Sequence, residues 1–96
     1  MKIYYKHSYR CPISAGTKME MDNYLRDKEE NDGIEFELID VVADGERSDE
    51  IAEQFGIEHE SPQIILADDN NQVLWTASHR KVTEKALKKA IADNSV

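Results

Sequence analysis

The start of the chain constrains the fold most, because a strand-like run is followed at once by a helical one. Residues 2–6 (KIYYK) have the aromatic and β-branched content that is typical of a short strand. Pro12 suits the first turn of a helix, where the N–H that proline lacks would have no partner. We expect this helix to end near Glu30, since its inward positions recur at helical spacing: Ile13, Thr17, Met21, Tyr24, Leu25 and Lys28.

A second strand and a second helix follow. Asp32 and Gly33 form the expected turn, and residues 34–42 (IEFELIDVV) alternate in polarity before becoming apolar, which predicts a strand. Ser48 is the expected N-cap of a short helix, and Gly56 supplies the left-handed residue that ends it.

The last part of the chain predicts a hairpin and a closing helix. Pro62 opens the apolar run QIILA, a position at which a strand tolerates proline. Residues 68–71 are a turn cluster, QVLWTAS over 72–78 is the antiparallel return strand, and Thr83 caps the last helix. The order β-α-β-α-β-β-α predicts an α/β fold, a single domain over residues 1–96, with a four-stranded mixed sheet flanked by helices.

This topology brings distant segments to one cysteine. The first two strands are expected to be parallel, so Cys11 lies beyond the carboxyl end of the first strand, where α/β proteins commonly bind ligands. An antiparallel third strand begins at that edge with Ser61 and Pro62, and the fourth strand ends there with residues 78–80. Because three segments converge on one thiol, we expect the functional site at this edge.

Composition and charge narrow the function classes. The 96 residues include one cysteine, so no disulfide can form within the chain, and we expect a cytoplasmic protein rather than a disulfide-stapled secreted one. No membrane-spanning segment is expected, because no apolar run approaches about 20 residues. No signal peptide is expected either, because residues 1–10 (MKIYYKHSYR) contain no apolar stretch followed by a small-residue cleavage site. A net charge of −8 argues against nucleic acid and anionic membranes as partners.

The chemistry expected at Cys11 follows from its neighbours. With Pro12 first in the helix, Cys11 is the expected N-cap. Its sulfur would then accept hydrogen bonds from the N–H groups of Ile13 or Ser14. The helix dipole, Arg10 and the Ser14 hydroxyl all favour the thiolate, which predicts a pKa below the usual value of about 8.5. The alternative, a cysteine buried as a small hydrophobe, fits poorly with a position between arginine and proline.

Residues 11–14 read Cys-Pro-Ile-Ser, a C-x-x-S motif at a strand-to-helix junction. Dithiol oxidoreductases carry C-x-x-C at this junction, and their second thiol resolves the mixed disulfide. Here Ser14 occupies the resolving position, so the expected chemistry is monothiol exchange. The Cys11 thiolate attacks a disulfide sulfur, and an outside thiol must then reduce the resulting mixed disulfide.

Four motifs occur in order along the chain: KHSYRCPIS at 6–14, HESPQ at 59–63, WTASH at 75–79 and VTE at 82–84. In these motifs the chain resembles the YtxJ-like monothiol bacilliredoxins, which are thioredoxin-fold proteins of bacillithiol-using bacteria. The resemblance extends from the start of the chain to about Ile91. The resemblance implies a thioredoxin-like fold in which Cys11 removes bacillithiol from S-bacillithiolated proteins and is itself bacillithiolated. Bacillithiol is then a co-substrate, and no tightly bound cofactor is implied. The remaining partner would be a recycling thiol or reductase.

The resemblance also implies a cis peptide bond between Ser61 and Pro62, with the Ser61 backbone pairing with the incoming disulfide. An ordinary trans proline that starts a strand is the alternative. The chain departs from the family pattern at Tyr9, where a small residue is expected. Relatives also often carry an additional helical stretch before the first strand.

A cationic rim would suit the malate carboxylates of bacillithiol. The candidates for this rim are Lys6, Arg10, His79 and Arg80. Solvated surface is the alternative for Lys6 and Arg80. His7 and His79 are candidate proton donors to a leaving thiolate, and a histidine that ties down a loop is the alternative.

Other histidines and the tryptophan carry less information. We expect His59 and Trp75 to be structural, and three histidines with one cysteine do not have a metal-site spacing.

Two other functions stay open. One is an iron–sulfur cluster carrier like the monothiol glutaredoxins, although Pro12 and Ile13 stand where those proteins have Gly-Phe. The other is a redox sensor or adaptor whose cysteine is modified without turnover.

Overall fold

The computed structural model describes residues 1–10, 12–28 and 32–94. Within these residues the chain forms four strands, three α helices and one 3₁₀ turn. In chain order they are β1 (Lys2–His7), α1 (Pro12–Asp27), β2 (Glu35–Asp40), α2 (Gly45–Phe55), β3 (Gln63–Ala67), β4 (Val73–Ser78), η1 (His79–Lys81) and α3 (Glu84–Asp93).

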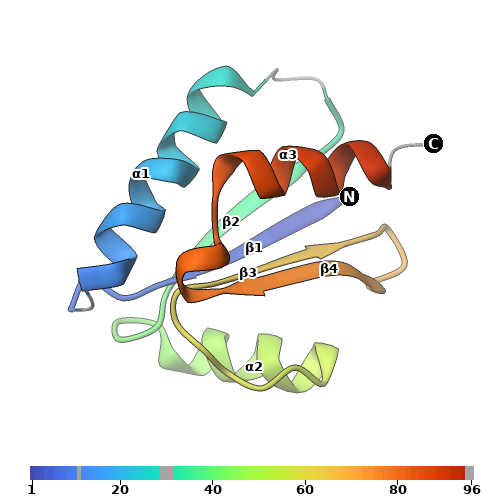
Figure 1. Ribbon diagram of the computed structural model, residues 1–96. Helices are drawn as coiled ribbons and strands as arrows, with labels where there is room; N and C mark the ends of the chain where they lie inside the picture. The colour runs from blue at the N-terminus through green and yellow to red at the C-terminus, as the bar shows by residue number, and fades with distance from the viewer. Residues whose placement is uncertain (11, 29–31, 95–96) are drawn as a thin grey trace.

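The strands form one mixed sheet in the order β2-β1-β3-β4. β1 and β2 are parallel, whereas β3 is antiparallel to both β1 and β4. Helices α1 and α3 cover one face of the sheet and α2 covers the other (Figure 1). The predicted four-stranded mixed sheet flanked by helices is therefore confirmed. No helix in the described part of the chain is both long and apolar enough to cross a bilayer.

The central strand β1 supplies side chains to both layers of the core. Successive residues of a strand point to opposite faces, and both faces are covered here. Ile3 and Tyr5 pack in the cluster beneath α1 and α3, whereas Tyr4 packs in the cluster beneath α2. Because the strand is central, even its polar carboxyl end is buried, and Lys6 and His7 are 0% and 2% exposed.

Local capping signals end several elements where the sequence predicts. α1 begins at Pro12, and Gly56 ends α2 in the left-handed conformation with φ 62°. Thr83 caps α3 by accepting a 3.1 Å hydrogen bond from the amide of Ala86. These boundaries depend on residues close in sequence, so sequence patterns capture them.

Three predicted boundaries are wrong. α1 ends at Asp27 rather than near Glu30. β2 stops at Asp40, because the Asp40 carboxylate accepts the amides of Val42 and Ala43 at 2.9 and 3.0 Å and turns the chain. Asp44, not Ser48, caps α2, so the helix starts earlier and Ser48 lies buried inside it.

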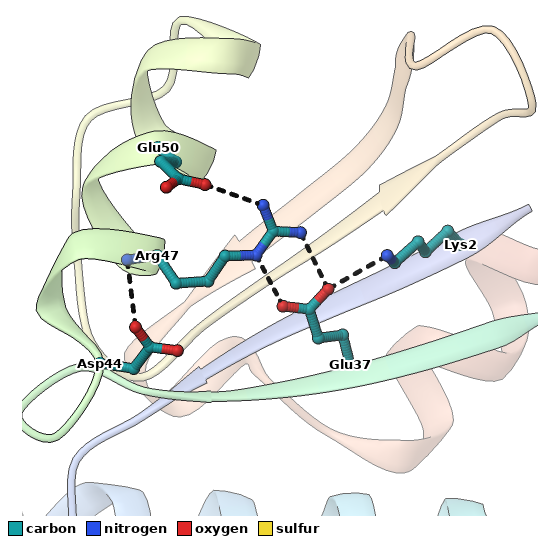
Figure 2. Close-up of polar contacts among 5 residues, drawn as sticks. All are labelled: Lys2, Glu37, Asp44, Arg47 and Glu50. Carbon is teal, nitrogen blue, oxygen red and sulfur yellow. Dashed lines mark hydrogen bonds and ion pairs between the residues drawn. The ribbon is translucent and has the colours of Figure 1, made fainter.

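A half-buried ion-pair network joins α2 to the sheet (Figure 2). The Arg47 guanidinium donates to both carboxylate oxygens of Glu37, at 2.8 and 3.0 Å, and to Glu50 at 3.2 Å. Lys2 approaches the same Glu37 carboxylate at 3.1 Å. The hydrogen bonds from Arg47 lower the pKa of Glu37 to about 2. This bidentate contact sets how α2 sits on β2.

Candidate active site

The ends of three strands meet at one edge of the sheet. Lys6 near the end of β1 pairs with Gln63 at the start of β3, and Gln63 pairs with Ser78 at the end of β4. η1 follows directly and packs against α1, whose first turn lies at the same end of the molecule (Figure 1). The predicted convergence is therefore correct for the described residues of these segments, which are 7–10 with 12–14, 61–62 and 78–80.

Cys11 itself lies outside the described residues. Its predicted N-cap position, its hydrogen bonds to the helix amides and its lowered pKa stay predictions. Its neighbours in the chain are described. Arg10 is exposed at the end of the loop after β1, and Pro12 is the first residue of α1.

The loop after β1 is tied to the first turn of α1. The amide of Ser8 donates to the Ser14 hydroxyl oxygen at 3.4 Å, and the amide of Arg10 donates to the Ser8 hydroxyl at 3.3 Å. Ser14 is 0% exposed. The residue in the resolving position therefore holds the loop that leads to the cysteine.

The Ser61–Pro62 peptide bond is cis. The carbonyl of Pro62 accepts a 2.8 Å hydrogen bond from the amide of His79, which joins the start of β3 to η1. The Ser61 hydroxyl oxygen is buried and has no hydrogen-bond partner among the described residues.

The backbone of His79 links the start of β3 to the turn of η1. Its φ of 56° lies in the left-handed region, which is uncommon for residues other than glycine. Its carbonyl accepts from the amide of Val82 at 3.2 Å, while its half-exposed ring lies 3.8 Å from the Glu60 carboxylate. The ring therefore stands at the surface of the site, and the role of His79 in a cationic rim stays a prediction.

Two adjoining cavities lie on the η1 side of this edge. One of about 410 Å³ lies between the start of α1 and the junction of η1 with α3. The other, of about 560 Å³, runs along the end of β4 and η1. Ile13 and Arg80 line both cavities, and Lys81 lines the second. Glu20 also lines the first cavity and Glu60 the second, so each lining carries both signs of charge. Volumes of this order suit small ligands, and Arg80 and Lys81 are the groups that could bind an anionic part of one.

The prediction that Lys6 belongs to a cationic rim is wrong. Its side chain is 0% exposed and points to the α2 side of the sheet, where Nζ lies 3.2 Å from Nδ1 of His59. Ser48 also contacts this nitrogen, at 3.1 Å. Burial lowers the pKa of Lys6 against a weaker opposing effect of Asp49. The strand pattern alone did not reveal that β1 is covered on both faces.

The same contacts support the structural role predicted for His59, because its ring links β1 to α2. Trp75 is partly buried against the larger core cluster, which supports its predicted structural role too.

His7 is buried at this edge rather than exposed on a rim. Its Nδ1 lies 3.1 Å from the Tyr5 hydroxyl, and the Tyr9 ring meets its ring edge-on with centroids 4.2 Å apart. Burial lowers the pKa of His7. The role of His7 as a proton donor stays a prediction.

Sequence reasoning missed Tyr5 and Thr17 as partners of this histidine. The Tyr5 hydroxyl lies 2.8 Å from Oγ1 of Thr17. Two signals point to this pair: Tyr5 and His7 share one face of a strand, and Thr17 is a polar residue on the inward face of its helix. Within the described ranges, no three histidine, cysteine or acidic side chains gather as a metal site would require.

Comparison with known proteins agrees with this geometry. Residues 1–87 match the family described as monothiol bacilliredoxin BrxC. A solved protein described as a thioredoxin-fold protein of proposed oxidoreductase activity is 31% identical, with a TM-score of 0.73 over 93% of this chain and 75% of its own.

More distant structures share the fold. Thioredoxin 1 from Thermosipho africanus is 15% identical, with a TM-score of 0.67 and full coverage of both chains. Thioredoxin-2 of a malaria parasite is 20% identical, with a TM-score of 0.70 over 97% of this chain and 82% of its own. The thioredoxin-like fold is therefore shown, and the family match supports a thiol–disulfide redox function.

Proposed function

The chain belongs to the monothiol bacilliredoxin family, and from this membership we propose that it removes bacillithiol from S-bacillithiolated proteins of the cytoplasm. The observation that carries the proposal is the family match over residues 1–87, which includes the Cys11-Pro12-Ile13-Ser14 motif. The fold supports it, since the motif directly precedes and opens α1 at the edge where β1, β3 and η1 meet.

The proposed reaction is one thiol–disulfide exchange at Cys11. Its thiolate attacks the bacillithiol sulfur of the mixed disulfide, a new S–S bond joins Cys11 to bacillithiol, and the substrate protein leaves as a thiolate that takes up a proton. A second, outside thiol or a reductase then attacks the Cys11–bacillithiol disulfide and restores the thiolate. Ser14 has no sulfur, so this second step cannot occur within the chain.

The two cavities beside η1 are the proposed binding site for the small thiol. Arg80 lines both, and we assign it to the carboxylates of bacillithiol together with the exposed Arg10 and His79. Ser61 directly precedes β3 at the same edge, and its backbone is the proposed partner of the incoming disulfide.

Mass spectrometry of the reduced protein after incubation with bacillithiol disulfide or glutathione disulfide tests this proposal. We expect a single bacillithiol adduct on Cys11 that forms faster than the glutathione adduct. The reduced protein should also release bacillithiol from a bacillithiolated substrate protein, and Cys11→Ala should not. An adduct that forms without any release from the substrate would indicate a sensor instead. Equal rates with both disulfides would contradict the assignment of bacillithiol.

A further inference from the structure

Two chain segments of opposite charge line the second cavity. The segment before β3 contributes Glu60, whose side chain is 42% exposed, and η1 contributes His79, Arg80 and Lys81, which are all exposed. The cavity measures about 560 Å³ and therefore has room for a small molecule. A carboxylate on one segment and a guanidinium and an ammonium on the other suit a ligand that carries both signs of charge.

The main chain fixes these two segments relative to each other. They lie side by side at one end of the sheet (Figure 1), where the amide of His79 donates to the carbonyl oxygen of Pro62 at 2.8 Å. From the sheet, Nε2 of Gln63 donates to the carbonyl oxygen of Glu58 at 3.0 Å, and Gln63 is only 2% exposed. Contacts on both sides of Glu60 in the sequence therefore hold the backbone that carries its carboxylate.

Of the two carboxylates in the cavity linings, Glu60 is the one left for a ligand. Glu20 of the first cavity is already engaged, because its Oε2 accepts the amide of Glu84 at 3.0 Å at the start of α3. Within the described part of the chain, the Glu60 carboxylate has one contact, with the His79 ring at 3.8 Å. This distance exceeds that of a hydrogen bond, and the pair is ionic only when the imidazole is protonated.

We propose that Glu60 is a specificity-determining residue of the small-thiol site, which binds an ammonium group of the ligand while Arg80 and Lys81 bind its carboxylates. This proposal rests on the proposed function and narrows its substrate class to small thiols, and their disulfides, that carry a primary ammonium group beside their carboxylates. The same carboxylate repels a ligand that carries only negative charge, so Glu60 selects by attraction and by repulsion.

The cavity also borders the C-x-x-S motif. Ile13, the third residue of that motif, lines the cavity together with Ala77 of β4. These side chains offer apolar contact to the carbon atoms of a ligand whose charged groups lie against Glu60 and Arg80. A charged pair of this kind therefore fixes the orientation of the ligand beside the start of α1.

Rates of mixed-disulfide formation with three small disulfides test the proposal, followed by mass spectrometry. Cystine carries ammonium and carboxylate groups, 3,3′-dithiodipropionate carries carboxylates alone, and 2-hydroxyethyl disulfide is uncharged. Each probe is compared between variants, so differences in intrinsic reactivity cancel. Glu60→Gln should slow the reaction with cystine about threefold to fivefold, because a half-exposed ion pair is lost. It should leave the uncharged probe unchanged and should not slow dithiodipropionate.

Glu58→Gln is the matched control. It removes the same charge from the same segment, and Glu58 is exposed and lines neither cavity. This variant should react with all three probes as the wild type does. An unchanged cystine rate in Glu60→Gln would overturn the proposal. Equal slowing of all three probes would overturn it too, and so would the same selective loss in Glu58→Gln.

A binding measurement separates this proposal from the proposed function. S-methylcysteine and 3-(methylthio)propionate are thioethers and cannot exchange, so NMR titration of the amides of Glu60, His79 and Arg80 needs no reaction. The wild type should bind S-methylcysteine more tightly, and Glu60→Gln should lose this preference. Equal dissociation constants in the wild type would overturn the proposal. A wild type that shows the preference but reacts with no disulfide would contradict the proposed function instead.

Discussion

The amide of His79 donates a 2.8 Å hydrogen bond to the carbonyl oxygen of Pro62. This bond joins two segments that are far apart in the sequence, the first residue before β3 and the 3₁₀ turn after β4. To make it, His79 adopts a left-handed backbone that glycine accepts more readily than any other residue. The position of His79 and Arg80 beside the second cavity thus depends on a main-chain contact.

His79→Gly should raise the free energy of unfolding by about 0.5–1 kcal/mol, because glycine has no Cβ to penalise a positive φ. His79→Ala is the matched variant, since it removes the same ring and retains the Cβ. It should be less stable than His79→Gly by a similar amount. Urea titrations of both variants measure the difference, and equal midpoints would mean that the left-handed backbone carries no cost.

Arg80→Gln should raise the KM for bacillithiol disulfide about fivefold to tenfold, because a charge-assisted contact to a carboxylate is lost. Steady-state kinetics at two salt concentrations measures this change, and the effect of salt on KM should weaken in the variant. Arg26→Gln, at the far end of α1, removes the same charge away from the cavities. A similar rise in KM for Arg26→Gln would show that only net charge matters.

Glu37→Gln should lower the free energy of unfolding at pH 7 by roughly 1–2 kcal/mol, because the bidentate contact with Arg47 is broken. The folded-state pKa of Glu37 is about 2, below the ordinary value of 4.5, so its contribution is fully present above pH 4.5. That contribution disappears as the pH falls from 4.5 towards 2.

Urea titrations of wild type and variant at pH 7, 4 and 2.5 follow this difference. We expect the gap between them to close as the pH falls. Glu53→Gln, on the exposed side of α2, should match the wild type at each pH. A gap that stays constant down to pH 2.5 would contradict the assigned charge state of Glu37.

Lys6→Met should raise the free energy of unfolding at pH 7 by roughly 1 kcal/mol, since methionine fills the space without a buried charge. In this variant Nδ1 of His59 loses its contact with the lysine but keeps a polar partner, because the Ser48 hydroxyl lies 3.1 Å from it. The folded-state pKa of Lys6 is below its ordinary value of 10.5, so the unfolded wild type binds the proton more tightly.

Wild-type stability therefore gains as the pH rises towards 10.5, and the advantage of Lys6→Met should shrink over that interval. Thermal or urea unfolding at pH 7 and pH 10 measures it, with the exposed Lys85→Met as the matched control. A destabilised Lys6→Met at pH 7 would show that the lysine contact with His59 outweighs the cost of burial.

Local sequence was sufficient for the element order and for several boundaries. Pro12, Gly56 and Thr83 act through their own φ, N–H or hydroxyl on neighbouring backbone groups, so their effects are visible in a window of a few residues. The cap of α2 was misplaced because Asp44 and Ser48 are both good caps. What favours Asp44 is that the buried Ser48 contacts His59, a residue of another segment.

The sequence by itself determined the α/β order, the C-x-x-S motif and the edge of the sheet where the site lies. The hydrophobic periodicity of a segment and the capping of a helix depend on residues close in sequence. Given the order of the elements, the rules of α/β topology then predict which strand ends meet. Only the tertiary structure decided which polar residues are buried there. β1 is the central strand, so Lys6 enters the α2 side of the core, and His7 joins Tyr5 and Thr17 beneath α1. Strand periodicity assigns a residue to a face, but only the packing of distant elements shows what covers that face.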